Sequence, residues 1–159
     1  MKYLYLIFCP ILMISCSDSV VDLEKEKEVV RKELFINALD GFKNKDAVAA
    51  ASIVPDNGNL LIADGKIIKY EKDTVIHHYE RSFKNEGSYE YTILEGPNID
   101  FFDNGQGCYG TIRIKMSITN KTDTASVVND IIVSSLFVGQ KQNGKWVSLV
   151  SSQTFETNN

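Results

Sequence analysis

The chain has 159 residues, 43% of them hydrophobic, and carries 17 basic against 21 acidic side chains. This apolar content, with only three prolines and three cysteines, excludes a disordered chain, a collagen-like fibre and a small disulfide-stapled scaffold. The length fits one globular domain. A formal net charge of -4 without a cluster of Lys and Arg argues against a nucleic-acid-binding protein, which needs such a cluster to replace the counterions of the phosphates.

The first residues are typical of an export signal. Met1 and Lys2 precede an uncharged, largely apolar segment, residues 3–14, which is too short to cross a bilayer as a helix, since that takes roughly 20 residues. The quartet Met13-Ile14-Ser15-Cys16 resembles the lipobox of bacterial lipoproteins, in which the cysteine becomes the lipidated first residue of the mature protein. The alternative is an ordinary signal peptide with an incidental cysteine.

The lipobox divides the chain into a signal peptide, residues 1–15, a tether, residues 16–23, and one domain, residues 24–157. We expect a protein anchored to the membrane through lipid on Cys16, in the bacterial cell envelope and at the outer membrane. Cys108 then has no cysteine partner within the mature chain, so we expect a small buried residue there rather than half of a disulfide.

Helical periodicity begins after the tether. Apolar residues recur at helical spacing from Val30 to Phe42, which predicts a helix with one face toward a core. Asp46 is placed to cap a second helix, from Ala47 to about Ile53, which Pro55 ends. On the first helix the charged residues are expected to face solvent: Glu26, Glu28, Lys32, Glu33 and Asp40.

A short hairpin and a third helix follow. Turn dipeptides on either side of residues 60–62 predict a hairpin with residues 66–70. The third helix is expected from about Glu71 or Asp73 to Phe83, with Tyr79 on its buried side.

After Gly87 the period of the apolar residues changes from 3.6 to 2, which is typical of strands. Short turns between successive strands favour an antiparallel meander. Three helices and a sheet with one apolar face predict an α+β domain, with the helices covering that face. The expected strands are Tyr89–Leu94, Asn98–Phe102, Gly107–Thr119, Val127–Gln140 and Lys145–Glu156.

The order of these elements, with the junction Lys45-Asp46, the hairpin turn Asp64-Gly65 and the final strand from Asn143-Gly-Lys-Trp146, resembles the nuclear transport factor 2-like superfamily, especially its SnoaL-like and DUF4440-type members. The resemblance covers residues 26–155. It implies a cone in which three N-terminal helices pack on a strongly curved, mainly antiparallel sheet, with a cavity at the open end and, in many members, a homodimer through the sheet. Members include isomerases, dehydratases, cyclases and epoxide hydrolases as well as non-catalytic proteins, so the fold alone leaves the function open.

Ketosteroid isomerase offers a test within this superfamily. Its chemistry needs an Asp base and, facing it, a Tyr and a protonated Asp in an apolar cavity. When Asp46 is laid on the aspartate that ends the isomerase's first helix, the Tyr position falls on Ala38, the base position on Ile62 and the second acid near Leu136. None of these side chains exchanges a proton. The resemblance therefore implies an apolar cavity lined by Ala38, Ile62, Leu136 and the helix residue Tyr79, without the isomerase mechanism.

Other candidate chemistry is sparse. His77 and His78 are adjacent, so on a helix they point about 100° apart and cannot chelate one metal together. Asp100, Asp130 and Glu95 are surface carboxylates by default, and any of them becomes a general-base candidate if it lies buried beside a tyrosine. The sequence contains no Gly-rich phosphate loop, nucleophile elbow or Cys/His metal spacing, so neither a cofactor nor a metal is expected.

Three functions remain open at this point. The leading hypothesis is a lipid-anchored envelope protein whose non-catalytic domain binds a small apolar ligand or a protein partner. The competing hypothesis is a SnoaL-like isomerase, dehydratase or hydrolase acting on a small hydrophobic substrate, with Asp100 as the first choice for the base. In the third, the cone is filled by its own side chains and the domain serves as a spacer.

Overall fold

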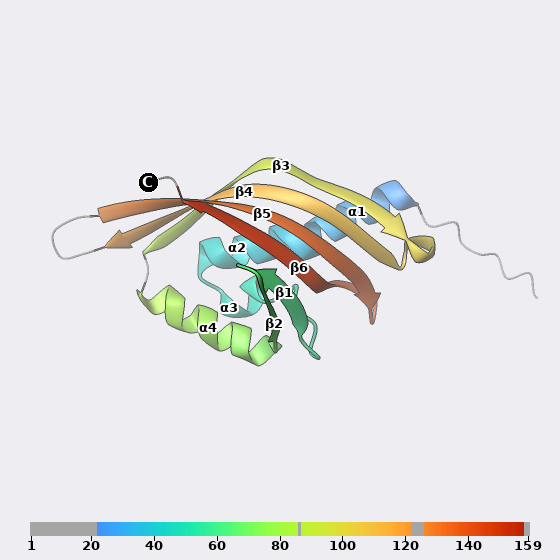
Figure 1. Cartoon of the computed structure of the whole chain (residues 1–159), viewed down its shortest axis with the longest axis horizontal. Coiled ribbons are helices and arrows are strands. Elements are labelled where there is room, and N and C mark those ends of the chain that lie inside the picture. The colour runs from blue at the N-terminus through green and yellow to red at the C-terminus, as the bar shows by residue number, and fades with distance from the viewer. Residues whose placement is uncertain (1–21, 86, 122–125, 158–159) are drawn as a thin grey trace, which may run out of the picture.

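The computed structural model describes residues 22–85, 87–121 and 126–157. The signal peptide, Cys16 and most of the tether lie outside these residues. The described chain has an α+β architecture in which a curved six-stranded sheet arches over the helices (Figure 1).

The predicted first helix is confirmed, and it consists of three consecutive segments: α1 (Leu23–Arg31), a π-helical turn η1 (Lys32–Ile36) and α2 (Asn37–Asn44). The Asp22 carboxylate caps the start by accepting from the Lys25 backbone N–H. The apolar face of these segments packs under the sheet through buried residues, namely Val30, Leu34, Phe35, Ala38 and Leu39.

The second helix is shorter than predicted. Asp46 caps α3 (Ala47–Ala50) as expected, because its carboxylate accepts from the Ala49 backbone N–H at 3.0 Å, but the helix ends at Ala50 rather than near Ile53. Close packing against α2 holds it there: a Cβ atom at Gly41 would lie 2.2 Å from the Ala50 backbone nitrogen. Only glycine permits this approach.

The hairpin and third helix are confirmed as β1 (Asn59–Ala63), β2 (Lys66–Tyr70) and α4 (Lys72–Asn85). Four long strands follow: β3 (Ser88–Phe102), β4 (Gly107–Lys121), β5 (Ser126–Gln142) and β6 (Lys145–Thr157), with a 3-10 turn η2 (Asp103–Gly105) between the first two. The two strands predicted on either side of Gly96-Pro97 are one strand. Bulges in its pairing with β4 absorb the proline, which has no N–H to give to the ladder.

The strands are ordered β2-β1-β6-β5-β4-β3. Strands β3 to β6 form the predicted antiparallel meander. The sheet is nevertheless mixed, because β1 pairs in parallel with β6, with Leu61 beside Ser151. This pairing places the β1–β2 hairpin and α4 under the same end of the sheet (Figure 1).

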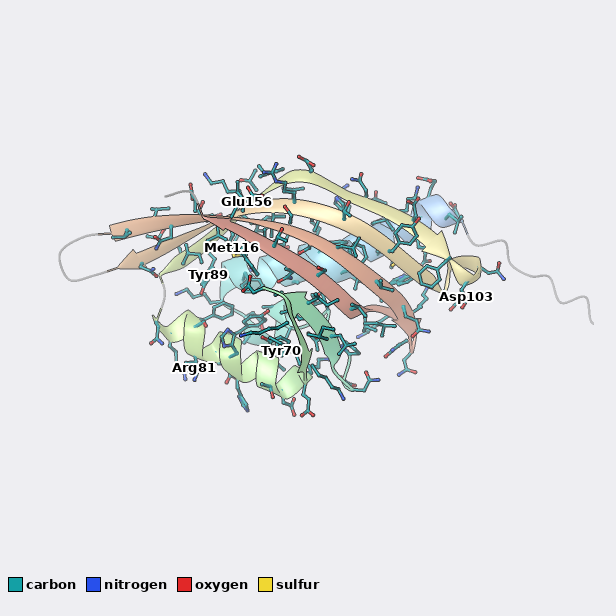
Figure 2. All side chains as sticks on the ribbon, in the orientation of Figure 1. Tyr70, Arg81, Tyr89, Asp103, Met116 and Glu156 are labelled. Atoms are coloured by element: carbon teal, nitrogen blue, oxygen red, sulfur yellow. The ribbon has the colours of Figure 1, made fainter. Side chains whose placement is uncertain are left out.

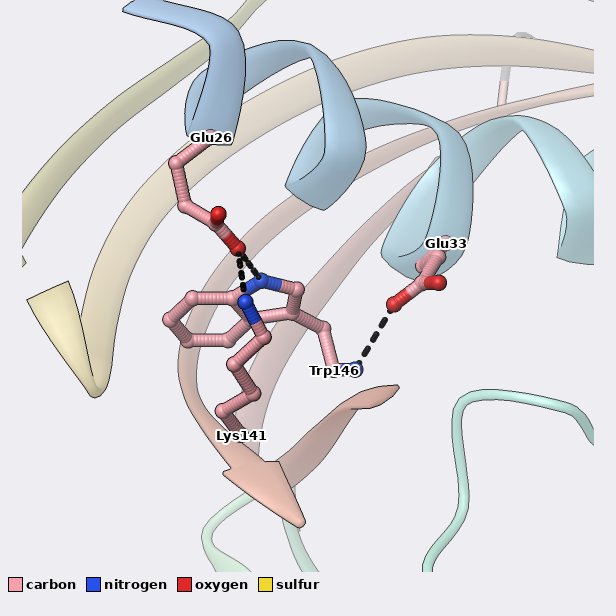
Figure 3. A network of polar contacts seen from close by, with 4 residues as sticks. All are labelled: Glu26, Glu33, Lys141 and Trp146. Carbon is pink, nitrogen blue, oxygen red and sulfur yellow. Dashed lines mark hydrogen bonds and ion pairs between the residues drawn. The ribbon is translucent and has the colours of Figure 1, made fainter. Parts of the chain in front are cut away.

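The other end of the core is organised around Trp146, whose side chain is 2% exposed. The Trp146 ring N–H donates to Glu26 at 2.5 Å, the same carboxylate oxygen accepts from Lys141 Nζ at 2.8 Å, and the Trp146 backbone N–H donates to Glu33 at 2.7 Å (Figure 3). The expectation that Glu26 and Glu33 face solvent is therefore wrong. Their helix turns them toward strands β5 and β6, which are remote in the sequence.

The charge on Glu26 is stabilised by this network. Burial by itself raises the pKa of a carboxyl group, but the hydrogen bonds from Lys141 and Trp146, with the positive charge of Lys141, outweigh burial and hold the pKa of Glu26 below its ordinary value. A carboxyl group whose pKa is lower in the folded than in the unfolded state stabilises the fold above the unfolded-state pKa. That stability is lost as the pH falls through the folded-state pKa.

We expect Glu26→Gln to lower the free energy of unfolding by about 1 kcal/mol at pH 7, because neutral hydrogen bonds replace two charge-assisted ones. The difference from the unsubstituted protein should shrink as the pH falls below about 4.3, the ordinary value for glutamate, because the unsubstituted side chain then becomes neutral as well. Urea unfolding at pH 7 and at several lower values measures both effects.

Glu24→Gln is the matched control on the same helix. The Glu24 side chain is 82% exposed and pairs only with Lys27 on the surface, so its replacement should change the free energy of unfolding by less than about 0.5 kcal/mol. A loss at Glu26 that stays constant down to acidic pH would contradict the charge-based explanation.

Candidate functional site

A cavity of about 220 Å³ lies on the concave side of the sheet, between α4, the β1–β2 hairpin and β6. Figure 2 shows Tyr70, one of its residues, beside α4, whereas Glu156 lies on the opposite, outer side of the sheet. The cone is thus not completely filled by its own side chains. The lining residues are Ile53, Val54, Asn59, Leu61, Tyr70, Val75, His78, Tyr79, Ser151 and Gln153.

Strand alternation and helical spacing together position these residues. In β1, Asn59 and Leu61 point to the concave side. The parallel register puts Leu61 beside Ser151 of β6, which brings that hydroxyl to the same wall. On α4, Val75 and Tyr79 are four residues apart and therefore share one face of the helix.

The cavity has a buried floor and a more open rim. Val54, Val75 and Asn59 are 5%, 7% and 8% exposed, so the floor combines two apolar side chains with one amide. His78 is exposed and lies at the rim, as expected for a histidine on the outer side of a surface helix.

The polar side chains around this cavity have no hydrogen bond to other protein atoms in the described chain. Buried and half-buried polar groups are ordinarily paired, as the Trp146 ring N–H is with Glu26. The donors and acceptors of the cavity are therefore available to a bound molecule. They belong to Asn59, Tyr70, His78, Tyr79, Ser151 and Gln153.

Tyr79 is a hydrogen-bond donor here and not a base. Burial raises the pKa of its phenol to about 12, and the neighbouring Tyr70 adds to the shift. The phenol therefore keeps its proton throughout the physiological range. It can hold an acceptor on a ligand, but it cannot remove a proton from one.

The cavity lining contains no Asp or Glu. Asp100 is exposed and lies beside Lys27 and Arg31 of α1 in a separate surface groove, because the alternation of β3 turns Ile99 and Phe101 inward and Asp100 outward. The prediction of Asp100 as a base facing the cavity is therefore wrong.

The other two carboxylates singled out from the sequence are also occupied elsewhere. Asp130 accepts from Ser117 at 2.6 Å and pairs with Lys115, and Glu95 pairs with Arg113. Neither of them is among the residues that line the cavity.

One carboxylate does bind a tyrosine under the sheet, and the sequence did not indicate it. The Tyr91 hydroxyl donates to Asp40 at 2.9 Å, and both side chains are half-buried. Burial makes the largest contribution to raising the pKa of the Tyr91 phenol, and the hydrogen bond to Asp40 and its charge raise the pKa further. The two groups satisfy each other outside the cavity lining, so this pair links α2 to β3 and leaves no free base.

The structure separates the four residues expected to line one cavity. Tyr79 lines it, Ala38 is buried in α2 and is not among the lining residues, and Ile62 and Leu136 are 37% and 48% exposed on the outer face. In both strands the neighbouring residue, Leu61 or Phe137, points inward instead. Because successive side chains of a strand alternate between its two faces, Ile62 and Leu136 point away from the cavity. The inward residues are apolar too, so the argument against the isomerase mechanism stands.

Residues 22–85, 87–121 and 126–157 hold no group of three or more His, Cys, Asp or Glu side chains placed to bind a metal ion. None of the helices in the same ranges is both long and apolar enough to cross a bilayer.

No family model and no curated protein matches this sequence. Solved structures do resemble the fold. A nuclear transport factor 2-like protein from Salmonella enterica matches with a TM-score of 0.66 at 8% identity, covering 86% of this chain and 95% of that one. A ketosteroid isomerase-like protein from Erwinia carotovora atroseptica matches with a TM-score of 0.55 at 18% identity, covering 89% and 99%.

A hexachlorocyclohexane dehydrochlorinase of type 2 is similar as well, with a TM-score of 0.64 at 11% identity over 86% of this chain and 93% of that one. These structures thus include an enzyme alongside proteins without a stated activity. Sequence identities this low support a shared fold but not a shared function. The described chain has the nuclear transport factor 2-like fold.

Proposed function

We propose that this chain is a lipid-anchored protein of the bacterial cell envelope whose domain binds a small uncharged molecule under the sheet without converting it. The observation that carries this proposal is the cavity wall. It offers unpaired hydroxyl and amide groups and an imidazole, but no carboxylate. The sequence led us to expect an apolar ligand; the wall favours a ligand with an apolar body and a few hydrogen-bonding groups.

The volume of the cavity and the charge of its lining narrow the class of ligand that it can bind. Pockets for drug-sized molecules usually measure about 300–1,000 Å³, so a cavity of about 220 Å³ takes something smaller. The lining includes no Lys, Arg, Asp or Glu to balance a charge, and burying an unpaired charge is costly. A neutral molecule fits best.

An enzyme of the SnoaL-like type is the second candidate, and His78 is the observation that favours it. Histidine is the side chain that most often serves as a general acid or base, and His78 is the one histidine among the residues that line the cavity. The side chain is exposed, however, and no hydrogen bond from another described residue fixes its orientation. Effective general bases are held in place by such bonds. The geometry therefore supports binding over turnover.

Tyr79→Phe should weaken the binding of a neutral acceptor such as cyclohexanone about threefold to tenfold, because the phenol donor is removed while the ring remains. Titrations followed by protein NMR give the affinity and locate the probe. Tyr109→Phe is the matched control, because Tyr109 is 47% exposed on the outer face. Equal effects of the two substitutions, or consumption of a substrate that His78→Gln abolishes, would contradict the proposal.

The lipid anchor rests on the sequence Met13-Ile14-Ser15-Cys16. Mass spectrometry of the membrane fraction should find a mature chain that begins at Cys16 and carries diacylglycerol on that residue. Cys16→Ser should abolish the modification, whereas Cys108→Ser, a change at a fully buried thiol, should leave it intact. A mature chain that begins at another residue would refute the anchor.

We also propose that a second copy of the chain packs on the outer face of the sheet. Leu60, Ile62, Leu136 and Tyr109 are each more than a third exposed there, and register places Ile62 and Leu136 on either side of Ser152. Arg113 and its acidic partners lie on the same face, so two copies related by a two-fold axis bring opposite charges together.

Leu136→Asp should convert a dimer of the purified protein into a monomer, because it places a charge at the centre of the proposed contact. Sedimentation velocity measures the change. Val48→Asp, at a residue that is 62% exposed on α3 away from this face, should leave the dimer intact. A monomer before any substitution would refute the contact.

A further inference from the structure

The floor of the cavity contains an amide that nothing in the described chain satisfies. Asn59 is the first residue of β1, is 8% exposed and lines the cavity, yet its side chain has no hydrogen bond to the described protein atoms. Its amide oxygen and nitrogen are not among the fully buried unpaired side-chain atoms of the described chain, which are Ser52 Oγ and Asn120 Oδ1, so they reach the open space of the cavity. A leucine of similar size would line the cavity without offering a donor or an acceptor.

The local backbone does not explain the asparagine. Asparagine is favoured over most other residues at positive φ, and Asn104 and Asn143 adopt that conformation. Asn59 does not. The turn before it is centred on Asp56 and Asn57, and the Gly58 N–H closes it by donating to the Pro55 carbonyl at 2.9 Å. The Asn59 backbone already pairs with Tyr70 in the β1–β2 ladder. We therefore attribute the presence of an asparagine at position 59 to the cavity that its side chain faces.

A carboxamide presents a donor and an acceptor side by side. A neutral group that also has an N–H donor beside a C=O acceptor can pair with both at once. Primary amides, lactams and imides are such groups. We propose that Asn59 selects ligands that carry such a group, binding it through two hydrogen bonds. This inference rests on the proposed ligand-binding function and specifies its ligand class.

The surroundings of Asn59 fit this ligand. Val54 and Val75 are buried on the same floor and contact the apolar part of the molecule, and Tyr79 supplies a further donor on the cavity wall. A carboxylate is disfavoured, because no Lys or Arg lines the cavity. Sites built around buried polar groups reject molecules that leave those groups unpaired, which is how one amide achieves selectivity.

Three probes of nearly equal size test the inference: 2-piperidone has the donor and the acceptor, N-methyl-2-piperidone keeps only the acceptor, and cyclohexanone is the ketone. We expect 2-piperidone to bind the unsubstituted protein about fivefold more tightly than either of the others. In NMR titrations it should also shift the Asn59 side-chain amide resonance. The probe series needs no substitution, so it stands even if a variant fails to fold.

Asn59→Leu should remove the preference for 2-piperidone, leaving its affinity within about twofold of that of cyclohexanone. Asn129→Leu is the matched control: Asn129 is an exposed strand residue of β5, and its replacement should change neither the preference nor the affinities.

The outcomes separate the two proposals. Equal binding of lactam and ketone, or a preference that survives Asn59→Leu, would overturn the selectivity of Asn59 while the ligand-binding function stands. If none of the three probes perturbs resonances of the cavity residues at millimolar concentration, the ligand-binding function itself is overturned, and the selectivity with it.

Discussion

The parallel pairing of β1 with β6 is the contact on which the candidate site depends. Parallel strands cannot be joined by a tight turn, and here β2, α4 and strands β3 to β5 lie between the two partners in the sequence. Without this pairing, the β1–β2 hairpin would have one short ladder and no sheet to join. With it, the hairpin becomes one wall of the cavity, β6 becomes a second, and α4 closes the third.

The opposite end of the domain is held by a different kind of contact. Trp146, at the start of β6, joins the last hairpin to the first helix, because two glutamates of that helix accept from its ring N–H and its backbone N–H. A tyrosine–aspartate pair, Tyr91 with Asp40, joins the next stretch of the helix to β3. Polar groups in this part of the core are thus matched with one another, which makes the unmatched groups at the cavity end more conspicuous.

Much of the fold follows from local signals in the sequence. Apolar periodicity located the helices and strands, and Asp46 marked the start of α3 because a cap depends on residues only three positions apart. Contacts between residues far apart in the sequence could not be predicted from these local signals. Glu26 and Glu33 occur in a charged pattern typical of a solvated face, and no neighbouring residue in the sequence indicates that they accept hydrogen bonds from Trp146. Of the cavity, Tyr79 was expected, while Asn59 was not, because its role depends on the β1–β6 pairing.

Alternation in β1 has one more consequence. Asn59 and Leu61 point into the cavity, while Leu60 and Ile62 point to the outer face, so two surfaces share four consecutive residues and are separated by the thickness of one strand. Point substitutions can therefore remodel either surface while the other keeps its side chains. A single-residue insertion at the start of the strand has no such freedom, since it would send isoleucine and leucine inward and expose the amide to solvent. We therefore expect this segment to tolerate changes in composition far better than changes in length.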